Sequence, residues 1–336
     1  MEEILTSETL EAEKVQSLVE TDEAQAPLEA NERKPEKQPN KNSLTKMENI
    51  IGWAYISPMV IGLLVFTAIP LIMSIMAMFY RWDGIHGLFD SKFIGFEHIK
   101  SIFKGEYAVT YWNAMKNTLI FTLQLPIGMI LGMFLALAMN RQMKGVQTFR
   151  VLYYLPGVMS IVAVAIVWQN IFASDGYINT FVMNAGGEPV KWLNSNLGVA
   201  FVVNVLLVWK GVGYTSLMFV AGLQSVSTDQ IEAAKIDGAN SWVILLKITL
   251  PALYPTIFYL FVTGLMGALQ MFNEPYILLG GYGVGNNGMT AVSFVYYYFG
   301  ERNLGLASVG AWVLALIIFI ITAIQMYVDR KRQEAE

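Results

Sequence analysis

Six long runs of apolar residues, separated by polar segments, dominate the chain after residue 47. They lie at about 50–79, 117–139, 151–172, 197–223, 253–279 and 306–327. A helix needs about 20 apolar residues to cross roughly 30 Å of hydrocarbon, and it satisfies its own backbone hydrogen bonds there. The pattern therefore predicts an all-α membrane protein with six transmembrane helices. Pro58 and Pro70 predict a kink or a tilt in the first helix.

The chain before these runs has a different composition. Residues 1–47 are polar and contain no aromatic residue. Such a segment buries too little apolar surface to offset its ordering entropy, so we expect a mostly disordered N-terminal tail with a short helix near 10–19. The domain organisation that follows is a six-span domain at 48–330 and a short C-terminal tail at 331–336.

Basic residues indicate how the helices are oriented. They are concentrated at 33–46, 141–150 and 330–332, with two more at Lys235 and Lys247. Cytoplasmic segments of membrane proteins are enriched in Lys and Arg. We therefore expect both termini in the cytoplasm, with the segment 81–116 outside the cell.

Composition excludes several classes of function. Of the 336 residues, 55% are hydrophobic and 14% charged, and none is Cys. Disulfides, thiolate metal sites and Cys nucleophiles are thus impossible. His86 and His98 are expected as an exposed pair in a loop, too few to hold a metal. No basic face with interleaved aromatic residues points to nucleic acid.

A nucleotide site is also not expected. The phosphate-binding pattern G-x-x-x-x-G-K-[ST] does not occur in the sequence. Gly283, Gly285 and Gly288 satisfy G-x-G-x-x-G, but they follow an apolar run and not a strand. We interpret this segment as a flexible outer loop. The polypeptide is therefore expected to have no cofactor and no enzyme activity of its own.

The polar segment at 224–252 contains the most informative motif. Ser227 can cap a helix, with Gln230 three residues later, and Gly238 can end that helix with a positive φ. A second helix is expected to begin after Gly238 and to lead into the fifth run through Pro251. This helix–break–helix hairpin can serve as a shallow docking surface, or it can be an amphipathic connector resting on lipid.

A resemblance favours the docking surface. Glu232-Ala233-Ala234, three residues, Gly238, nine residues and then Ile248-x-Leu250-Pro251 resemble the EAA signature of ABC importer permeases. Asp237-Gly238-Ala239 resembles the variant of sugar-type permeases. The segments 149–172 and 209–226 are similar to the same family. The resemblance covers about 48–330 and implies the fold of a type I ABC importer permease.

In that family the hairpin supplies a coupling helix that docks on a separate ATPase subunit. The resemblance implies an ATPase-coupling role for five residues: Glu232, Ala233, Ala234, Asp237 and Gly238. It further implies a complex with a second homologous permease subunit, two ATPase subunits and an extracellular solute-binding protein. The complex would import a sugar, most naturally an oligosaccharide, across a bacterial cytoplasmic membrane by alternating access. The shorter outer segment 81–116 would then contact the binding protein.

Polar and aromatic residues inside the apolar runs are candidates for substrate contacts, because intramembrane polar groups are costly and usually functional. Lys210 and Glu274 are the charged residues inside the runs, and Gly211 and Gly213 predict a bend beside Lys210. Their different depths argue against a direct pair. The resemblance to maltose-type permeases, whose third to fifth spans bind oligosaccharide, adds Ser160, Thr263 and Gly267. The candidates for substrate binding are Ser160, Trp168, Gln169, Trp209, Lys210, Tyr214, Thr263, Gln270, Asn273 and Glu274.

Two alternatives remain open. The same kind of permease could carry another polar solute, such as a glycerol phosphate ester, although one Lys offers few cations for a phosphate. A chain of a different class, an ion-coupled secondary transporter, could use Lys210 and Glu274 as ion carriers. The sequence has no internal repeat, which counts against that class.

Overall fold

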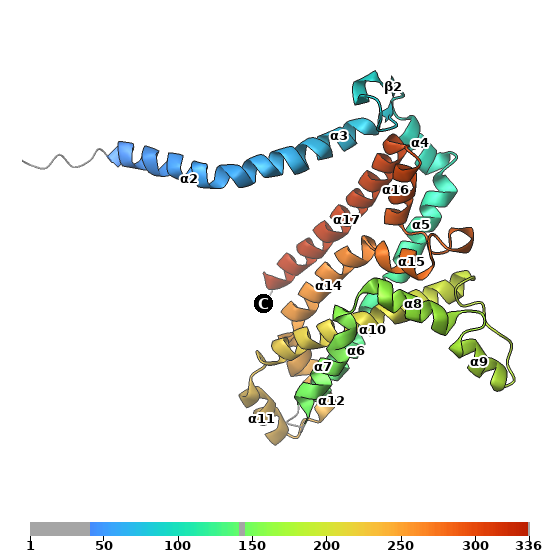
Figure 1. The fold of residues 1–336 in the computed structure, drawn as a ribbon. Coiled ribbons are helices and arrows are strands. Elements are labelled where there is room, and N and C mark those ends of the chain that lie inside the picture. The colour runs from blue at the N-terminus through green and yellow to red at the C-terminus, as the bar shows by residue number, and fades with distance from the viewer. Residues whose placement is uncertain (1–40, 141–144, 335–336) are drawn as a thin grey trace, which may run out of the picture. The chain divides into compact units, whose positions relative to one another are not determined.

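The computed structural model describes residues 41–140 and 145–334, and most of them are helical (Figure 1). The expected helix at 10–19 and most of the expected N-terminal tail lie outside the described residues. The chain divides into two units, one ending at Thr67 and one beginning at Ala68.

The first unit is the helix α2 (Lys41–Leu63), which contains Pro58 and leads into the π-helical segment η1 (Leu64–Ala68). The helix α3 (Ile69–Ala77) follows, with Pro70 in its first turn. Proline lacks an N–H, and its ring clashes with the carbonyl four residues earlier, so a wider π turn before Pro70 accommodates it. The first run thus contains a π-helical segment next to Pro70, where the sequence predicted a kink or a tilt. The helix α2 begins at Lys41, six residues before the apolar span that runs from Met47 to Ala77.

The outer segment between the first two runs is largely ordered. Strands β1 (Tyr80–Arg81) and β2 (Lys92–Phe93) form a small antiparallel sheet, with the 3-10 helix η2 (Leu88–Asp90) between them. The helix α4 (Glu97–Lys104) follows. Within the described residues, β1 and β2 are the only strands, and all other regular secondary structure is helical.

The expectation of two exposed loop histidines is half wrong. His86 lies in an exposed turn held by Asp83, whose carboxylate accepts hydrogen bonds from the backbone of Ile85 and His86. These bonds lower the pKa of Asp83 to about 2. His98 is instead buried in α4, and burial lowers the pKa of its imidazole.

The second and fourth runs form the most closely packed helix pair of the second unit. The second run comprises α5 (Ala108–Phe121) and α6 (Gln124–Met139), and it begins nine residues earlier than expected. The fourth is α10 (Asn196–Leu223), a continuous helix of 28 residues. A Cβ on Gly132 would lie 2.8 Å from Cγ2 of Thr215, so this glycine lets α6 approach α10 closely.

The third run is broken where a continuous helix was expected. The helices α7 (Val146–Val158) and α8 (Ile161–Phe172) are separated by Met159 and Ser160, whose ψ angles of 145° and 129° are not helical. The short helix α9 (Tyr177–Asn184) follows α8. Buried Asn179 fixes α9 through hydrogen bonds to the backbone of Ala173, Ser174 and Val190.

The fifth run is also divided. The helix α14 (Tyr254–Leu269) ends ten residues before the expected position, and α15 (Asn273–Leu278) follows a break. Before α14, the segment Ser241–Ala252 meets it at 64°.

Sequence patterning missed α16 (Ala291–Gly300), a short aromatic-rich helix that packs beside α17 (Leu304–Gln333) (Figure 1). The expected C-terminal tail at 331 has no structural boundary, because α17 continues through it.

Five helical segments of the described residues are long and apolar enough to span a membrane, or six if the bent pair counts as one. Three buried clusters hold the second unit together. Ile102, Tyr111, Phe294 and Leu306 are central to the first, and Phe121, Val164, Leu206 and Leu278 to the second. The third, around Ala136, Phe219, Leu223 and Leu253, lies where α6, α10 and α14 meet.

Candidate functional site

The hairpin at 224–252 has the local structure expected from its sequence. The helix α11 (Thr228–Ile236) begins at Ser227, whose Oγ accepts a hydrogen bond from the backbone N–H of Gln230 at 3.4 Å. Gly238 follows with φ +80°, a conformation that other L residues adopt only at a cost. Asn240 then caps α12 (Ser241–Ile244) by accepting from the backbone N–H of Val243 at 2.9 Å.

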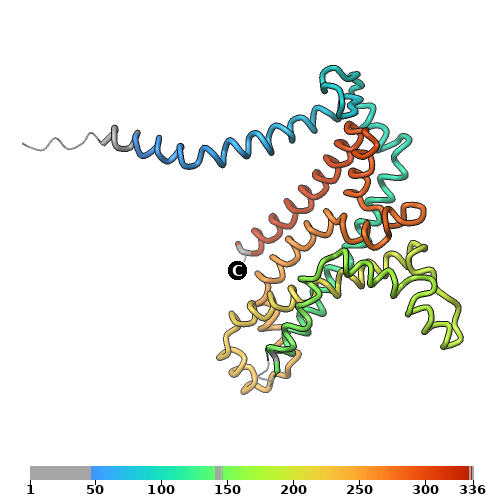
Figure 2. Tube along the Cα trace, in the orientation of Figure 1, coloured from blue at the N-terminus to red at the C-terminus, as the bar shows by residue number. Residues whose placement is uncertain are grey.

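After α12 the chain continues through a π-helical turn, η3 (Leu245–Thr249), and the short helix α13 (Leu250–Ala252) into α14. The yellow and orange trace in Figure 2 shows this hairpin at one end of the helices of the second unit. Ile231 and Ile248 pack against the third buried cluster. The hairpin is therefore attached firmly to the ends of α10 and α14.

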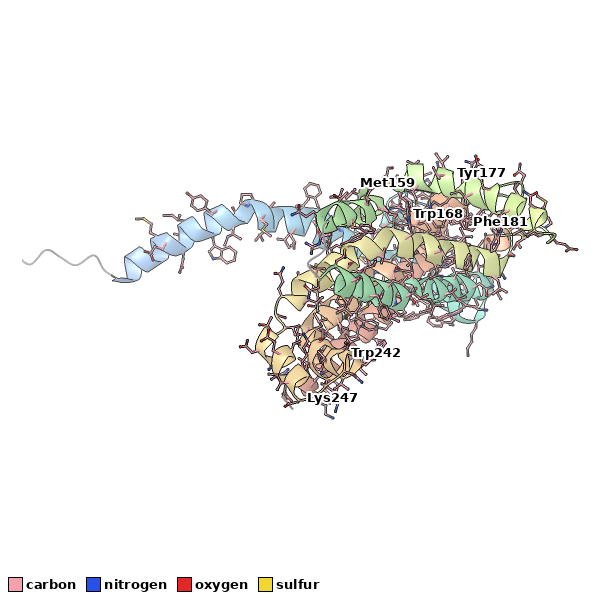
Figure 3. The ribbon with its side chains drawn as sticks, turned by 90° about the horizontal axis from the view of Figure 1, so that it is seen from below. Met159, Trp168, Tyr177, Phe181, Trp242 and Lys247 are labelled. Carbon is pink, nitrogen blue, oxygen red and sulfur yellow. The ribbon has the colours of Figure 1, made fainter. Side chains whose placement is uncertain are left out.

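The outer surface of the hairpin is uncovered. Glu232, Ala233, Asp237 and Gly238 are exposed, and Ala234 is half-buried. Sequence reasoning missed two apolar side chains on the same hairpin, Ile236 and Trp242, which are 87% and 64% exposed. Figure 3 shows Trp242 and Lys247 in the α12–η3 part of the hairpin. The available signal was their apolar character in an otherwise polar segment.

A second group of candidates meets at the break between α7 and α8. The Nζ of Lys210 donates a hydrogen bond to the backbone carbonyl of Met159 at 3.1 Å, so the break has a partner from α10. Gly157 makes this contact possible, because a Cβ there would lie 3.2 Å from the carbonyl oxygen of Lys210. Ser160 is the exposed second residue of the break.

The helix α10 is uninterrupted beside Lys210, where the sequence predicted a bend. Gly213 instead admits the neighbouring helix, because a Cβ on Gly213 would lie 2.5 Å from the carbonyl oxygen of Tyr153. A Cβ on Gly211 would meet no atom within 4 Å. The break lies in the third run, opposite Lys210, and not in the fourth.

Aromatic candidates lie on the helices that flank this break. Trp168 of α8 and Trp209 of α10 have ring centroids 5.8 Å apart and planes tilted by 47°. Tyr214, one turn after Lys210 on α10, interacts through its side chain with Tyr259 of α14. Thr263 donates its hydroxyl hydrogen to the carbonyl of Tyr259 at 2.7 Å. These residues place aromatic and hydroxyl groups along α8, α10 and α14.

The remaining candidates lie elsewhere. The Nε2 of Gln169 donates to the carbonyls of Ile277 at 3.1 Å and Leu278 at 2.8 Å, so this amide caps the end of α15. Gln270 borders an apolar cavity of about 550 Å³ between α14, α16 and α17. Asn273 and Glu274 form the first turn of α15. Glu274 forms no ion pair with Lys210.

The glycine-rich segment 283–288 does not have the context of a dinucleotide site, since the helix α15 precedes it and not a strand. The loop is exposed at 284–286 and buried at 287–288. It contains the 3-10 turn η4 (Val284–Asn286), and Asn117 donates to the carbonyls of Asn286 and Met289. Among the described residues no cluster of three or more His, Asp or Glu side chains could hold a metal.

Relatives match the chain along most of its length. The "Probable ABC transporter permease protein YesP" of Bacillus subtilis (strain 168) is 35% identical over 290 residues, which is 84% of this chain and 92% of that protein. The "Lactose transport system permease protein LacF" of Rhizobium radiobacter is 28% identical over 88% of this chain and 99% of that protein.

Solved structures agree. A chain of a bacterial ABC transporter "involved in the import of the acidic polysaccharide alginate" superposes with a TM-score of 0.74 and 25% identity, over 87% of this chain and 99% of that one. A second structure of an alginate transporter, in complex with its periplasmic protein, gives a TM-score of 0.73 at 25% identity, over 86% and 96%. Residues 128–334 match the family described as "Binding-protein-dependent transport system inner membrane component". The chain belongs to this family of ABC transporter permeases and is a multi-pass membrane protein.

Proposed function

We propose that this chain is one permease subunit of an ATP-driven importer that carries an oligosaccharide across the cytoplasmic membrane. ATP hydrolysis takes place on two separate ATPase subunits, and a second, homologous permease subunit completes the pathway. An extracellular solute-binding protein delivers the sugar. Relatives named for lactose transport and for alginate import support the sugar class.

The hairpin α11–Gly238–α12 is the observation that carries this proposal. Its exposed Ile236 and Trp242 offer apolar contacts, Glu232 and Asp237 offer charges, and the two caps make the unit rigid. A rigid lever transmits a displacement that a flexible loop would absorb. Because Ile231 and Ile248 connect it to the third buried cluster, a movement of the hairpin displaces α10 and α14 directly.

We place the hairpin and both termini in the cytoplasm, where the ATPase subunits bind. The resulting topology puts the β1–β2 sheet, α4 and α9 outside, within reach of the binding protein. The distribution of basic residues supports this orientation.

Substrate contacts are proposed at the break between α7 and α8. A sugar ring has an apolar face that suits Trp168, Trp209 and Tyr214, and a polar rim that suits Ser160 and Lys210. Gln169 is a weaker candidate, because its amide N–H groups already bind the end of α15. Gln270, Asn273 and Glu274 are separate from this group.

An ion-coupled transporter would need Lys210 and Glu274 to act together, and these two residues form no ion pair. The test of the proposed function is ATP turnover by the reconstituted complex of permeases, ATPases and binding protein in vesicles. We expect oligosaccharide loaded on the binding protein to stimulate both hydrolysis and uptake. Uptake by the permease subunits without ATPase partners would contradict the proposal.

A further inference from the structure

Lys210 is a cation at the middle of a long apolar helix. It follows Asn196 by fourteen residues and precedes Leu223 by thirteen, so it lies about 21 Å and about 20 Å from the two ends at 1.5 Å per residue. A charged side chain at such a depth is costly, and it normally faces an aqueous path or an opposite charge. The position of Lys210 therefore indicates a group on the transport pathway.

The described part of the chain provides no opposite charge for Lys210. Carboxylates there pair with Arg81, His86 and Arg330, and no ion pair includes Lys210. The ammonium donates to one neutral acceptor, the carbonyl of Met159. An ammonium has three N–H donors, so two remain for another acceptor.

The surroundings of the ammonium suit a sugar. The Met159 carbonyl and Ser160 belong to an interrupted helix, and irregular backbone at membrane depth is tolerated where it lines a cavity or is covered by protein. Tyr214 lies four residues after Lys210, hence on the same face of α10. Trp209 adjoins Lys210 in sequence and packs near Trp168.

On the basis of the sugar import proposed above, we propose that Lys210 binds the carboxylate of a sugar acid, so that the importer carries oligosaccharides containing uronic acid units. A carboxylate offers one negative charge and acceptor oxygens for the two free N–H donors. A neutral sugar provides acceptors but no compensating charge. A phosphate ester group carries up to two negative charges near neutral pH and would need more cations than this one.

The test compares two probes in vesicles that contain the complete complex and its binding protein. One probe is a uronic acid pentasaccharide, and the other is the same molecule with each carboxyl group reduced to an alcohol. The affinity of the binding protein for each probe is measured separately, so that selection by that protein can be subtracted. The variants are Lys210→Met and Lys210→Arg, and Lys191→Met on the exposed outer segment before α10 is the matched control.

We expect Lys210→Met to lower kcat/KM for uptake of the acidic probe by about tenfold or more, because the variant loses a desolvated charge contact with the carboxylate. Uptake of the reduced probe should not fall in this variant. Lys210→Arg should retain uptake of the acidic probe, and Lys191→Met should import both probes as the unaltered protein does.

Each contrary result has a distinct meaning. An equal loss for both probes in Lys210→Met would overturn the proposal and leave Lys210 as a support for the helix break. If the unaltered protein imports only the reduced probe, the carboxylate proposal is overturned as well, but the proposed function of sugar import stands. Import of neither probe, while another solute is imported, would contradict the proposed function itself.

Discussion

Alanine substitution at two glycines of α10 should have opposite effects on stability. Gly211 and Gly213 both flank Lys210, and the sequence treats them alike as places where α10 could bend. A Cβ on Gly213 would lie 2.5 Å from the carbonyl oxygen of Tyr153 and 2.8 Å from the Cα of Tyr154. Real Cβ atoms stay more than 3.0 Å from such neighbours, and a Cβ on Gly211 would meet none within 4 Å. Gly213→Ala must therefore separate α7 from α10, whereas Gly211→Ala need not move anything.

The magnitudes follow from this geometry. Overpacking a close contact costs about 1–3 kcal/mol, and Gly213→Ala incurs this cost whereas Gly211→Ala does not. Alanine favours a helix interior by about 1 kcal/mol over glycine, so Gly211→Ala should be neutral or stabilising. Both positions gain this preference, so the two single-methyl variants should differ by the overpacking cost alone, about 1–3 kcal/mol in free energy of unfolding.

Denaturant unfolding of the purified protein in detergent, followed by tryptophan fluorescence, measures this difference. Gly213→Ala should also weaken the contact between Lys210 and the Met159 carbonyl, because that carbonyl terminates the displaced helix. Destabilisation by Gly211→Ala together with tolerance of Gly213→Ala would refute the packing argument. It would indicate that α10 flexes beside Lys210.

Three further predictions concern other parts of the chain. Gly238→Val should leave the complex assembled but reduce uptake per ATP hydrolysed, because φ +80° costs a β-branched residue more than about 1–2 kcal/mol. Gly238→Asn should be tolerated. Equal uptake per ATP hydrolysed in the two variants would count against a rigid hairpin. Asn179→Leu should destabilise the segment 173–192 by about 2 kcal/mol or more, seen as faster amide exchange there, because it leaves buried backbone groups unpaired. Burial lowers the pKa of His98, so at pH values below the ordinary histidine pKa of 6.5 the unfolded state binds a proton more readily than the folded state. The stability of α4 should therefore fall between pH 7 and pH 5. His98→Phe should remove that pH dependence.

Local signals in the sequence predicted the hairpin well. Ser227 has a side chain that caps a helix, and Gly238 can take a positive φ, so these two residues predicted where α11 begins and ends. The cap that Asn240 provides for α12 was not predicted. These are effects within a few residues of the chain. The existence of apolar helices was predictable for the same reason, since span length depends on a local run of apolar residues.

The breaks inside the runs were not predictable in this way. Met159 and Ser160 are ordinary helix residues in an apolar sequence, and the free carbonyl of Met159 finds its partner in a lysine 51 residues later. The break between α14 and α15 likewise has a partner from another segment, since Thr290 donates its hydroxyl hydrogen to the carbonyl of Met271 at 2.7 Å. The helix α16 was missed because ten apolar residues are too few to span a membrane.

The role of the hairpin is the central claim, and the absence of Cys from the chain allows a direct test. Ile236→Cys places a single thiol on the 87% exposed position at the end of α11. Tyr177→Cys, at a 76% exposed position on α9, is the control on the outer side. With a short thiol–amine crosslinker in the assembled complex, we predict that the thiol at 236 joins an ATPase subunit and the thiol at 177 does not. A thiol at 236 that reacts only with a lipid-soluble reagent and never with an ATPase subunit would contradict the account.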